Sequence, residues 1–273
     1  MNDQDLKKAV RESYSRVAKN SQSCCSSGCC GSTKPQSISK KIGYTDGQME
    51  DAPAGSNLGL GCGNPIAYAC LKEGETVLDL GSGAGFDCFL ASKIVGPGGK
   101  VIGVDMTAEM ISRAKANANQ GGYGNVEFRL GEIEALPVED NAIDAVISNC
   151  VINLVPDKKK AFQEAFRVLK PGGRMMVSDI VLLKALPDFV RQSIKAYVGC
   201  IAGALPKDRY LDAIKSAGFM DVCVVQESIF PLDCMTNDPT GQAILKSLDG
   251  SAEERMKVED CISSVKVSGL KPN

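Results

Sequence analysis

The hydrophobic and polar positions of the chain follow two different periods. Near the N-terminus, Leu6, Val10, Tyr14 and Val17 fall on one stripe of a helix, so the pattern predicts an amphipathic helix over 5–17. From residue 76 onward, short apolar runs alternate with helical stretches such as 86–95 and 107–119. The apolar runs predict five strands, at 76–80, 100–105, 126–130, 143–148 and 174–179. This alternation predicts an α/β fold with a doubly wound, mostly parallel sheet and right-handed crossovers.

The segments around this sheet have a different composition. Residues 20–39 are rich in Ser, Gly and Cys, and residues 43–63 are rich in turn-forming residues, so we expect loops that form a lid or entry segment. After residue 187 the pattern becomes mostly helical, and late strands at 222–227 and 262–267 either close one sheet edge or form a small C-terminal layer. We therefore predict an N-terminal helix and lid at 1–58, a sheet domain at 59–228 and a C-terminal segment at 229–273.

A glycine-rich turn, DLGSGAG at 79–85, directly follows the first predicted strand. Glycine at 81, 83 and 85 lets the backbone turn tightly and approach a ligand without interference from Cβ atoms. The helix that follows presents its free N–H groups to that ligand. The second strand ends at Asp105, at a spacing that suits a carboxylate binding ribose hydroxyls. The sequence therefore predicts a nucleotide-type cofactor site.

The detailed form of this turn narrows the cofactor. A dinucleotide fingerprint would have glycine at 86, where this chain has Phe86. The tighter Gly-x-Gly-x-Gly form, with Asp79 two positions before it, resembles the S-adenosylmethionine-dependent methyltransferases with a Rossmann-like sheet. The resemblance covers about residues 60–228, and GEIEALP at 131–137 and LKPGG at 169–173 agree with it. It implies a methyltransferase domain with S-adenosylmethionine as cofactor.

The resemblance also implies roles for single residues. Asp79 and Gly81 would lie near the methionine moiety, and Asp105 would bind the ribose. Met106 would flank the adenine, while Glu132 and Ile133 would meet its edge. The candidate cofactor-binding residues are Asp79, Gly81, Ser82, Gly83, Gly85, Asp105, Met106, Glu132, Ile133 and Asn149.

Composition excludes several classes of function. The net charge is −2 and no basic block occurs, so we expect no nucleic-acid partner. The start, MNDQDLKKAV, lacks an apolar signal region, and no run approaches the roughly 20 apolar residues of a membrane span, so we expect no membrane partner and a cytoplasmic location. The 273 residues include twelve cysteines and no histidine. In a reducing compartment such a surplus indicates metal binding or thiol chemistry more than a disulfide framework.

Three cysteines lie where ligands bind in an open α/β sheet. Cys62 precedes the first strand, Cys150 follows the fourth, and Cys200 follows the fifth; each lies in a glycine-rich or turn-rich segment. Three thiols without a histidine or an obvious carboxylate partner suit a soft, thiophilic centre. Asn149, beside Cys150, suits the positioning of cofactor or substrate. We expect the other cysteines outside 24–30 to pack as small apolar side chains: Cys70, Cys88, Cys223, Cys234 and Cys261.

The segments GLGCGNP at 59–65, SNCVINLVPDK at 148–158 and GCIAGAL at 199–205 together resemble the arsenite methyltransferases. Those enzymes bind trivalent arsenic through cysteine thiolates and methylate it with S-adenosylmethionine. The resemblance implies that Cys62, Cys150 and Cys200 bind arsenic and act in catalysis. It also implies arsenite and methylated arsenicals as substrates, in arsenic detoxification, and a thiol reductant such as thioredoxin or glutathione.

The segment CCSSGCC at 24–30 contains two pairs of adjacent cysteines. As a zinc site it is poor, because adjacent cysteines rarely both bind one metal well and no second ligand pair has a suitable spacing. One hypothesis is auxiliary capture of arsenite by a mobile loop, and the alternative is an oxidisable segment without a role in the reaction. The residues concerned are Cys24, Cys25, Cys29 and Cys30.

Two other functions stay open at this point. One is a methyltransferase for a small organic acceptor, in which the cysteines are only structural. The other is a non-catalytic protein that binds a metalloid or metal. Binding of arsenite and turnover with S-adenosylmethionine would separate these alternatives from an arsenite methyltransferase.

Overall fold

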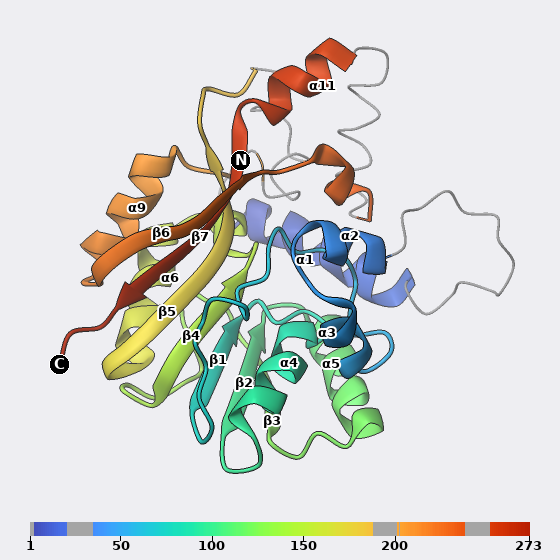
Figure 1. The fold of residues 1–273 in the computed structure, drawn as a ribbon, viewed down its shortest axis with the longest axis vertical. Coiled ribbons are helices and arrows are strands. Elements are labelled where there is room, and N and C mark those ends of the chain that lie inside the picture. The colour runs from blue at the N-terminus through green and yellow to red at the C-terminus, as the bar shows by residue number, and fades with distance from the viewer. Residues whose placement is uncertain (1–2, 21–34, 188–200, 202, 238–251) are drawn as a thin grey trace, which may run out of the picture.

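A seven-stranded sheet forms the centre of the protein, with the strand order β3-β2-β1-β4-β5-β7-β6 (Figure 1). The computed structural model describes residues 3–20, 35–187, 201, 203–237 and 252–273. Strands β1 to β5 pair in parallel, and β7 pairs antiparallel with both β5 and β6. The strands are β1 (Thr76–Leu80), β2 (Lys100–Asp105), β3 (Val126–Leu130), β4 (Ile143–Asn149), β5 (Leu169–Leu182), β6 (Met220–Ile229) and β7 (Ile262–Leu270).

The doubly wound α/β class predicted from the sequence is confirmed, because helices cover both faces of the sheet. One buried core joins α1, α4 and α5 to the sheet, and a second core joins α6 and α9 to the opposite face. The helices are α1 (Asp3–Asn20), α2 (Pro35–Lys41), α3 (Asp46–Asp51), α4 (Phe86–Val95), α5 (Ala108–Gly121), α6 (Lys158–Val168), α9 (Lys207–Ser216) and α11 (Ala252–Glu259), with short 3₁₀ turns at Ile152–Leu154 and Leu232–Met235.

The central strands form where the sequence has continuous apolar runs. In β1, Val77, Leu78 and Leu80 are fully buried, as expected of a strand covered on both faces. Strand β5 is longer than the predicted 174–179. Its first residue pairs with Ile143 of β4, and its last residue pairs with Ile262 of β7. Pairing with distant strands therefore extends an element whose local sequence, KPGG, indicates a turn.

Two segments predicted as loops contain short helices. Helix α2 begins at Pro35, whose fixed backbone angle suits the first helical position. Helix α3 begins after Thr45, whose side chain accepts a hydrogen bond from the backbone N–H of Gln48 in a reciprocal capping box. The capping residues therefore start short helices although the surrounding glycine and serine residues favour loops.

The C-terminal strand lies inside the sheet. Because β7 inserts between β5 and β6, the late strands close one edge of the sheet and do not form a separate layer. The strand order reverses between β1 and β4. Ligands of open α/β sheets bind at such a point, beyond the carboxyl ends of the strands. The division into segments at 58 and 228 stays a prediction.

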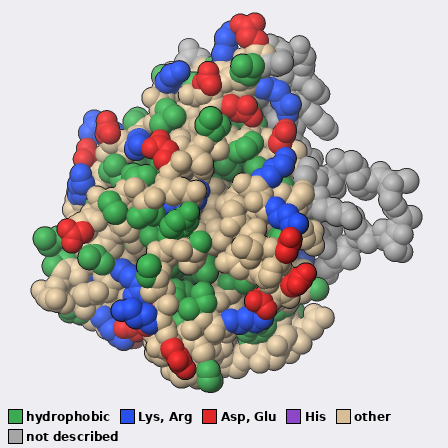
Figure 2. Space-filling model, viewed as in Figure 1, with side chains coloured by type: hydrophobic (Ala, Val, Ile, Leu, Met, Phe, Trp, Pro, Cys, Tyr) green, Lys and Arg blue, Asp and Glu red, His purple; other side chains and the backbone are tan. Residues whose placement is uncertain are grey.

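The described surface carries charges of both signs. On the face seen in Figure 2, Lys and Arg side chains alternate with Asp and Glu side chains, with apolar side chains between them. Among the described residues, no helix is both long and apolar enough to cross a membrane.

Candidate functional site

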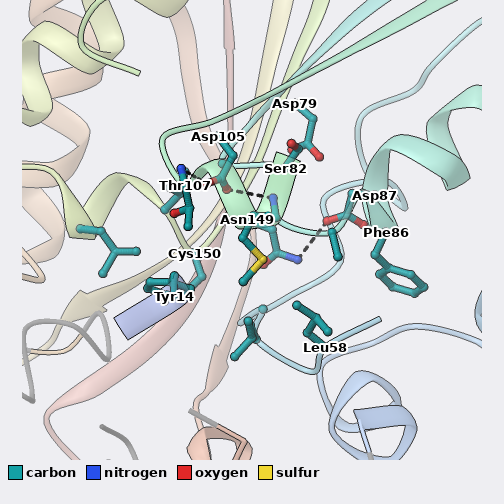
Figure 3. A pocket seen from close by; sticks show the side chains of 18 of the residues that line it. Tyr14, Leu58, Asp79, Ser82, Phe86, Asp87, Asp105, Thr107, Asn149 and Cys150 are labelled. Carbon is teal, nitrogen blue, oxygen red and sulfur yellow. Dashed lines mark hydrogen bonds between the residues drawn. The ribbon is translucent and has the colours of Figure 1, made fainter. Parts of the chain in front are cut away.

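A large pocket opens beyond the carboxyl ends of β1 and β4 (Figure 3). We call it the main pocket; its empty volume is about 1130 Å³, including its open mouth. The pocket is lined by the glycine turn after β1, the ends of β2 and β4, and residues of α1 and of the loop at 56–61. Every predicted cofactor residue except Gly85 lines it: Asp79, Gly81, Ser82, Gly83, Asp105, Met106, Glu132, Ile133 and Asn149.

The three glycines of the turn, Gly81, Gly83 and Gly85, differ in the space that surrounds them. All have positive φ, which favours glycine. A Cβ on Gly81 would lie 2.4 Å from a methyl carbon of Val151, and a Cβ on Gly85 would lie 2.7 Å from the ring of Phe128. A Cβ on Gly83 would meet no atom of the described residues within 4 Å. Gly85 therefore serves packing behind the pocket, while Gly83 leaves open space for a ligand.

Three buried or half-buried carboxylates surround this turn: Asp79, Asp87 and Asp105. Asp105 accepts hydrogen bonds from the backbone N–H groups of Gly83, at 3.0 Å, and Thr107, at 2.8 Å. Burial raises the pKa of Asp105, although these N–H groups oppose the shift. Burial also raises the pKa of Asp79 well above its ordinary value, with repulsion from Asp87 as a further cause. The pocket therefore has acidic groups that a cationic ligand would keep ionised.

Asn149 joins the main pocket to the loop that carries Cys62. Its side-chain oxygen accepts from the backbone N–H of Cys62 at 3.0 Å. Its amide nitrogen donates to the carbonyl of Gly63 at 2.8 Å and to Asp87 at 3.2 Å (dashed in Figure 3). Tyr44 donates to the other oxygen of Asp87 at 2.6 Å. Burial raises the pKa of Asp87 to about 6.

Asp87 and Tyr44 could not be recognised from the sequence, because both lie in segments whose local pattern indicates only a helix start or a turn.

Two polar groups in this pocket have no protein partner among the described residues. They are the hydroxyl of Ser82 and the amide nitrogen of Asn57, both buried. Buried polar groups are nearly always hydrogen-bonded, to protein, water or ligand. Together with the open space at Gly83 and the ordered carboxylate of Asp105, they fit a polar, nucleoside-type ligand.

Helix α1 covers one side of the main pocket, through Lys7, Val10 and Tyr14. Lys7 forms ion pairs with Glu132 at 2.7 Å and with Glu134 at 2.5 Å. These two carboxylates belong to the GEIEALP segment. The N-terminal helix therefore contributes to the walls of the pocket, as expected of a covering segment.

The loop with Cys62 is pressed against the ends of three strands. A Cβ on Gly61 would lie 2.6 Å from the Asn149 amide nitrogen, and one on Gly63 would lie 2.0 Å from the Ser178 hydroxyl. The Cys62 carbonyl accepts from the hydroxyl of Ser264 in β7 at 2.7 Å. Glycine on both sides of Cys62 is therefore required by close approach, and the approach buries the thiol to 1% exposure.

Cys150 comes to the same place from the end of β4. It has a φ of 60°, in the left-handed region that non-glycine residues rarely adopt, and its backbone N–H donates to the Ser178 carbonyl at 2.7 Å. The sulfurs of Cys62 and Cys150 and a carboxylate oxygen of Asp179 all lie within 4.8 Å of one another. The structure thus brings together two cysteines that are 88 positions apart in the sequence.

Asp179 is a carboxylate that sequence analysis did not identify. It is fully buried in β5 and accepts hydrogen bonds from Asn153 at 2.9 Å and from the Tyr210 hydroxyl at 3.0 Å. Burial raises its pKa to about 7, opposed by the Tyr210 hydrogen bond and by the charge of Lys158. The strand pattern alone gave no signal, because Asp179 sits at a position that looks like the last residue of a buried strand.

Several predicted residues cannot be placed. Cys200 and the cysteines of CCSSGCC lie outside the described residues. The remaining cysteines divide into two groups. Cys88, Cys234 and Cys261 are buried as expected, but the prediction is wrong for Cys70 and Cys223, which are exposed. Cys70 lies in a loop before β1, and Cys223 lies in β6 at the sheet edge, where one face is open to solvent.

Chemically, the arrangement combines a nucleoside-type pocket with a pair of buried thiols beside it. Cys150 itself lines the main pocket. Thiols of this kind bind soft, thiophilic atoms in preference to hard ones. A soft atom held by both sulfurs would therefore lie next to the ligand of the main pocket.

Comparison with known proteins agrees with this geometry. A family model described as a methyltransferase domain matches residues 71–218, more than half of the chain. An arsenite methyltransferase of Halobacterium salinarum is 48% identical over 225 residues, which are 79% of this chain and 58% of that protein. A human arsenite methyltransferase is 36% identical, over 75% of this chain and 56% of that protein. The chain therefore spans between half and two thirds of the length of these relatives.

A solved structure agrees as well. The crystal structure of an arsenic(III) S-adenosylmethionine methyltransferase from Chlamydomonas reinhardtii has a TM-score of 0.63 and 32% identity, and covers 89% of this chain and 75% of that chain. The domain match shows that the chain is a methyltransferase, and these relatives show which family of methyltransferases it belongs to. The chain belongs to the arsenite methyltransferase family.

Because the Cys62 loop lies so close to the strands, substitution of its glycines should lower the stability of the protein. Gly63→Ala places a Cβ against Ser178 and Lys266, so we expect the free energy of unfolding to fall by about 1–3 kcal/mol, measured by urea denaturation. The matched control is Gly124→Ala, whose Cβ would meet nothing within 4 Å and which should change stability by less than about 0.5 kcal/mol. Equal losses in the two variants would contradict the close approach.

The raised pKa of Asp179 predicts a pH dependence of the free energy of unfolding. Its pKa of about 7 lies above the ordinary 3.8, so between these values the folded protein holds a proton that the unfolded chain has lost. The contribution of Asp179 to stability therefore falls as pH rises through this window, by about 4 kcal/mol at most. Because an amide at this position cannot ionise, Asp179→Asn should gain stability relative to wild type between pH 5 and pH 8 in urea denaturation. The exposed control Asp212→Asn should follow wild type, and parallel pH curves for all three proteins would contradict the burial of a titrating Asp179.

Proposed function

We propose that this protein transfers methyl groups from S-adenosylmethionine to trivalent arsenic bound by cysteine thiolates. The observation that carries the proposal is the pair of sulfurs at Cys62 and Cys150, which lie within 4.8 Å of each other beside the main pocket, with Cys150 in its wall. The relatives are arsenite methyltransferases, which supports the same acceptor. The proposed role is arsenic detoxification.

The main pocket is the proposed site of the methyl donor. Asp105 would bind the ribose hydroxyls with the oxygen lone pairs that its backbone donors leave free. Asp79 and Gly81 would lie near the methionine moiety, and Met106, Glu132 and Ile133 near the adenine. The unpartnered Ser82 hydroxyl supports this fit. When bound, the donor supplies an electrophilic methyl group on a positively charged sulfur.

Arsenic is the substrate, and the proposed ligands are Cys62, Cys150 and Cys200. Thiolates suit this soft atom, and each thiol that binds must lose its proton. Three sulfurs around As(III) form a pyramid, so the remaining direction holds a lone pair. Because Cys150 lines the main pocket, this lone pair can point toward the donor methyl group.

The protein's own contribution is mainly orientation. Asn149 binds the backbone of Cys62 on one side and Asp87 of the main pocket on the other, so it fixes the two halves of the site relative to each other. Holding an acceptor and a donor in line supplies roughly 7–11 kcal/mol of the barrier reduction. This chemistry needs little proton transfer, in keeping with a chain that has no histidine.

The electron balance implies a thiol reductant. Methyl transfer uses the arsenic lone pair and leaves arsenic formally pentavalent. If two thiolates then leave as a disulfide, arsenic regains two electrons and becomes trivalent, while the two cysteines lose them. Thioredoxin or glutathione would return the cysteines to thiols. Such a cycle suits the reducing cytoplasm.

The proposed role of the CCSSGCC cysteines at 24–30 is to capture arsenite before it reaches the site.

The direct test is arsenite titration followed by product analysis with S-adenosylmethionine and glutathione. We expect wild type to bind arsenite and release methylated arsenic. We expect Cys150→Ser to lose about 10–100-fold in arsenite affinity, because one soft ligand is gone, and to lose turnover with it. The control is Cys223→Ser, an exposed cysteine in β6, which should behave as wild type. Full arsenite affinity and turnover in Cys150→Ser would show that Cys150 is not an arsenic ligand, whereas a wild-type protein that neither binds nor methylates arsenite would favour a small organic acceptor instead.

A further inference from the structure

A second cavity lies beside Cys62, between residues 41–43 at the end of α2, the segment at 62–68 and the ends of β6 and β7. Its empty volume is about 580 Å³, including its mouth, or about half that of the main pocket. Its polar lining consists of two lysines, two serines, an asparagine, a glutamine, a tyrosine and one thiol: Lys41, Lys266, Ser228, Ser264, Asn64, Gln226, Tyr68 and Cys62. Among the described residues that line it there is no carboxylate. The cavity is therefore built for an anion.

Lys266 is the main charge in this cavity. Its side chain enters from β7 and is only 3% exposed. Among the described residues, its ammonium has one hydrogen bond, to the Ser264 hydroxyl at 3.1 Å, and no ion-pair partner. Burial lowers the pKa of Lys266, while negative charge at Cys62 opposes that shift. Apart from a thiolate at Cys62, this buried ammonium has no counter-ion among the described residues. A buried charge with so little compensation is costly, so its retention here indicates a negatively charged ligand.

The two site cysteines face different cavities. Cys150 lines the main pocket, Cys62 lines the second cavity, and their sulfurs lie within 4.8 Å of each other. The thiol pair therefore separates the two spaces. A molecule in the second cavity would reach the sulfur of Cys62 from the side opposite the methyl donor.

We propose that the second cavity binds a low-molecular-mass thiol that carries a carboxylate, with the carboxylate on Lys266 and the sulfur directed at Cys62. This inference rests on the proposed function, because it names the reductant class for the same site. Lys41 at the cavity wall adds a second positive charge for a ligand with two carboxylates. The hydroxyl of Ser228 and the amide of Gln226 supply hydrogen bonds to the rest of such a molecule.

Burial favours a small thiol over a protein thiol. Cys62 is 1% exposed and Cys150 is 7% exposed, so the active cysteine of a folded reductase cannot reach either sulfur without rearrangement of this protein. A molecule of glutathione size can enter a cavity of this volume. Of the two reductants expected from the sequence, the cavity thus selects the small one.

The redox step balances with two molecules of the small thiol. The first attacks Cys62 in a Cys62–Cys150 disulfide as a thiolate, so a bond to Cys62 forms, the disulfide breaks, and Cys150 leaves as a thiolate. The second attacks the sulfur of the first, so the oxidised small disulfide leaves and Cys62 is released as a thiolate. Two small thiols lose two electrons and two protons, and both cysteines regain their thiols.

The test measures binding without arsenic and without a methyl donor. S-methylglutathione, which keeps both carboxylates but cannot react, is titrated into the full-length reduced protein by calorimetry at pH 7 and low salt. We expect it to bind wild type, to bind Lys266→Met at least about 10-fold more weakly, and to bind Lys40→Met as wild type. Lys40 neighbours Lys41 on α2 but does not line the cavity, and it pairs with Asp46 on the surface. A diester of the same ligand should bind wild type as weakly as S-methylglutathione binds Lys266→Met, which tests the charge without a mutation.

Equal binding of S-methylglutathione to wild type and Lys266→Met, or of the ligand and its diester to wild type, would overturn the site. Tighter binding of acetate or phosphate than of S-methylglutathione would also overturn it, in favour of a simple anion site. These results are independent of methylation. Conversely, if the protein methylates arsenite but Lys266→Met has the wild-type KM for glutathione, the inference fails while the proposed function stands.

Discussion

The close approach of the Cys62 loop to the ends of β4, β5 and β7 is the constraint on which the site depends. Glycine at 61 and 63 removes the two Cβ atoms that would keep the loop away from Asn149 and Ser178. The Cys62 backbone N–H donates to Asn149, and the Cys62 carbonyl accepts from the Ser264 hydroxyl, so two hydrogen bonds fix the loop at this position. Only this approach brings a residue from before the first strand next to the residue after the fourth. The cysteine pair is thus a product of backbone packing and not of local sequence.

The two sides of the thiol pair carry charged groups of opposite sign. On the side of the main pocket lie buried carboxylates, Asp79 and Asp87, whose pKa values are raised by burial and which a cationic methyl donor would return to the ionised state. On the side of the second cavity lies the ammonium of Lys266. A carboxylate oxygen of Asp179 lies within 4.8 Å of both sulfurs, so the protonation state of Asp179 determines whether a negative charge lies beside the thiols. A positively charged donor and an anionic thiol would be drawn to opposite sides of the pair.

Much of this could be predicted from the sequence, and the exceptions share a cause. Strands β1, β2 and β3 begin and end where predicted, because apolar runs between glycine-rich turns are local signals. The convergence of Cys62 and Cys150 followed from the rule that ligands bind beyond the carboxyl ends of strands. Asp179 and Lys266 could not be recognised, because each looks like an ordinary strand residue until β7 pairs with β5. The second cavity lies at the ends of β6 and β7, so it depends on the position of β7 between β5 and β6, which no local sequence pattern indicates. The exposure of Cys223 likewise follows from the place of β6 at the sheet edge.

The central claim is that Cys62 and Cys150 share one soft atom. X-ray absorption at the arsenic edge, on protein loaded with one equivalent of arsenite, measures the number of sulfur atoms bonded to arsenic. The account predicts that Cys62→Ser and Cys150→Ser each lower this number by one relative to wild type, since each removes a ligand of the same atom. An unchanged sulfur number in either variant would show that arsenic is bound elsewhere, and would contradict the account.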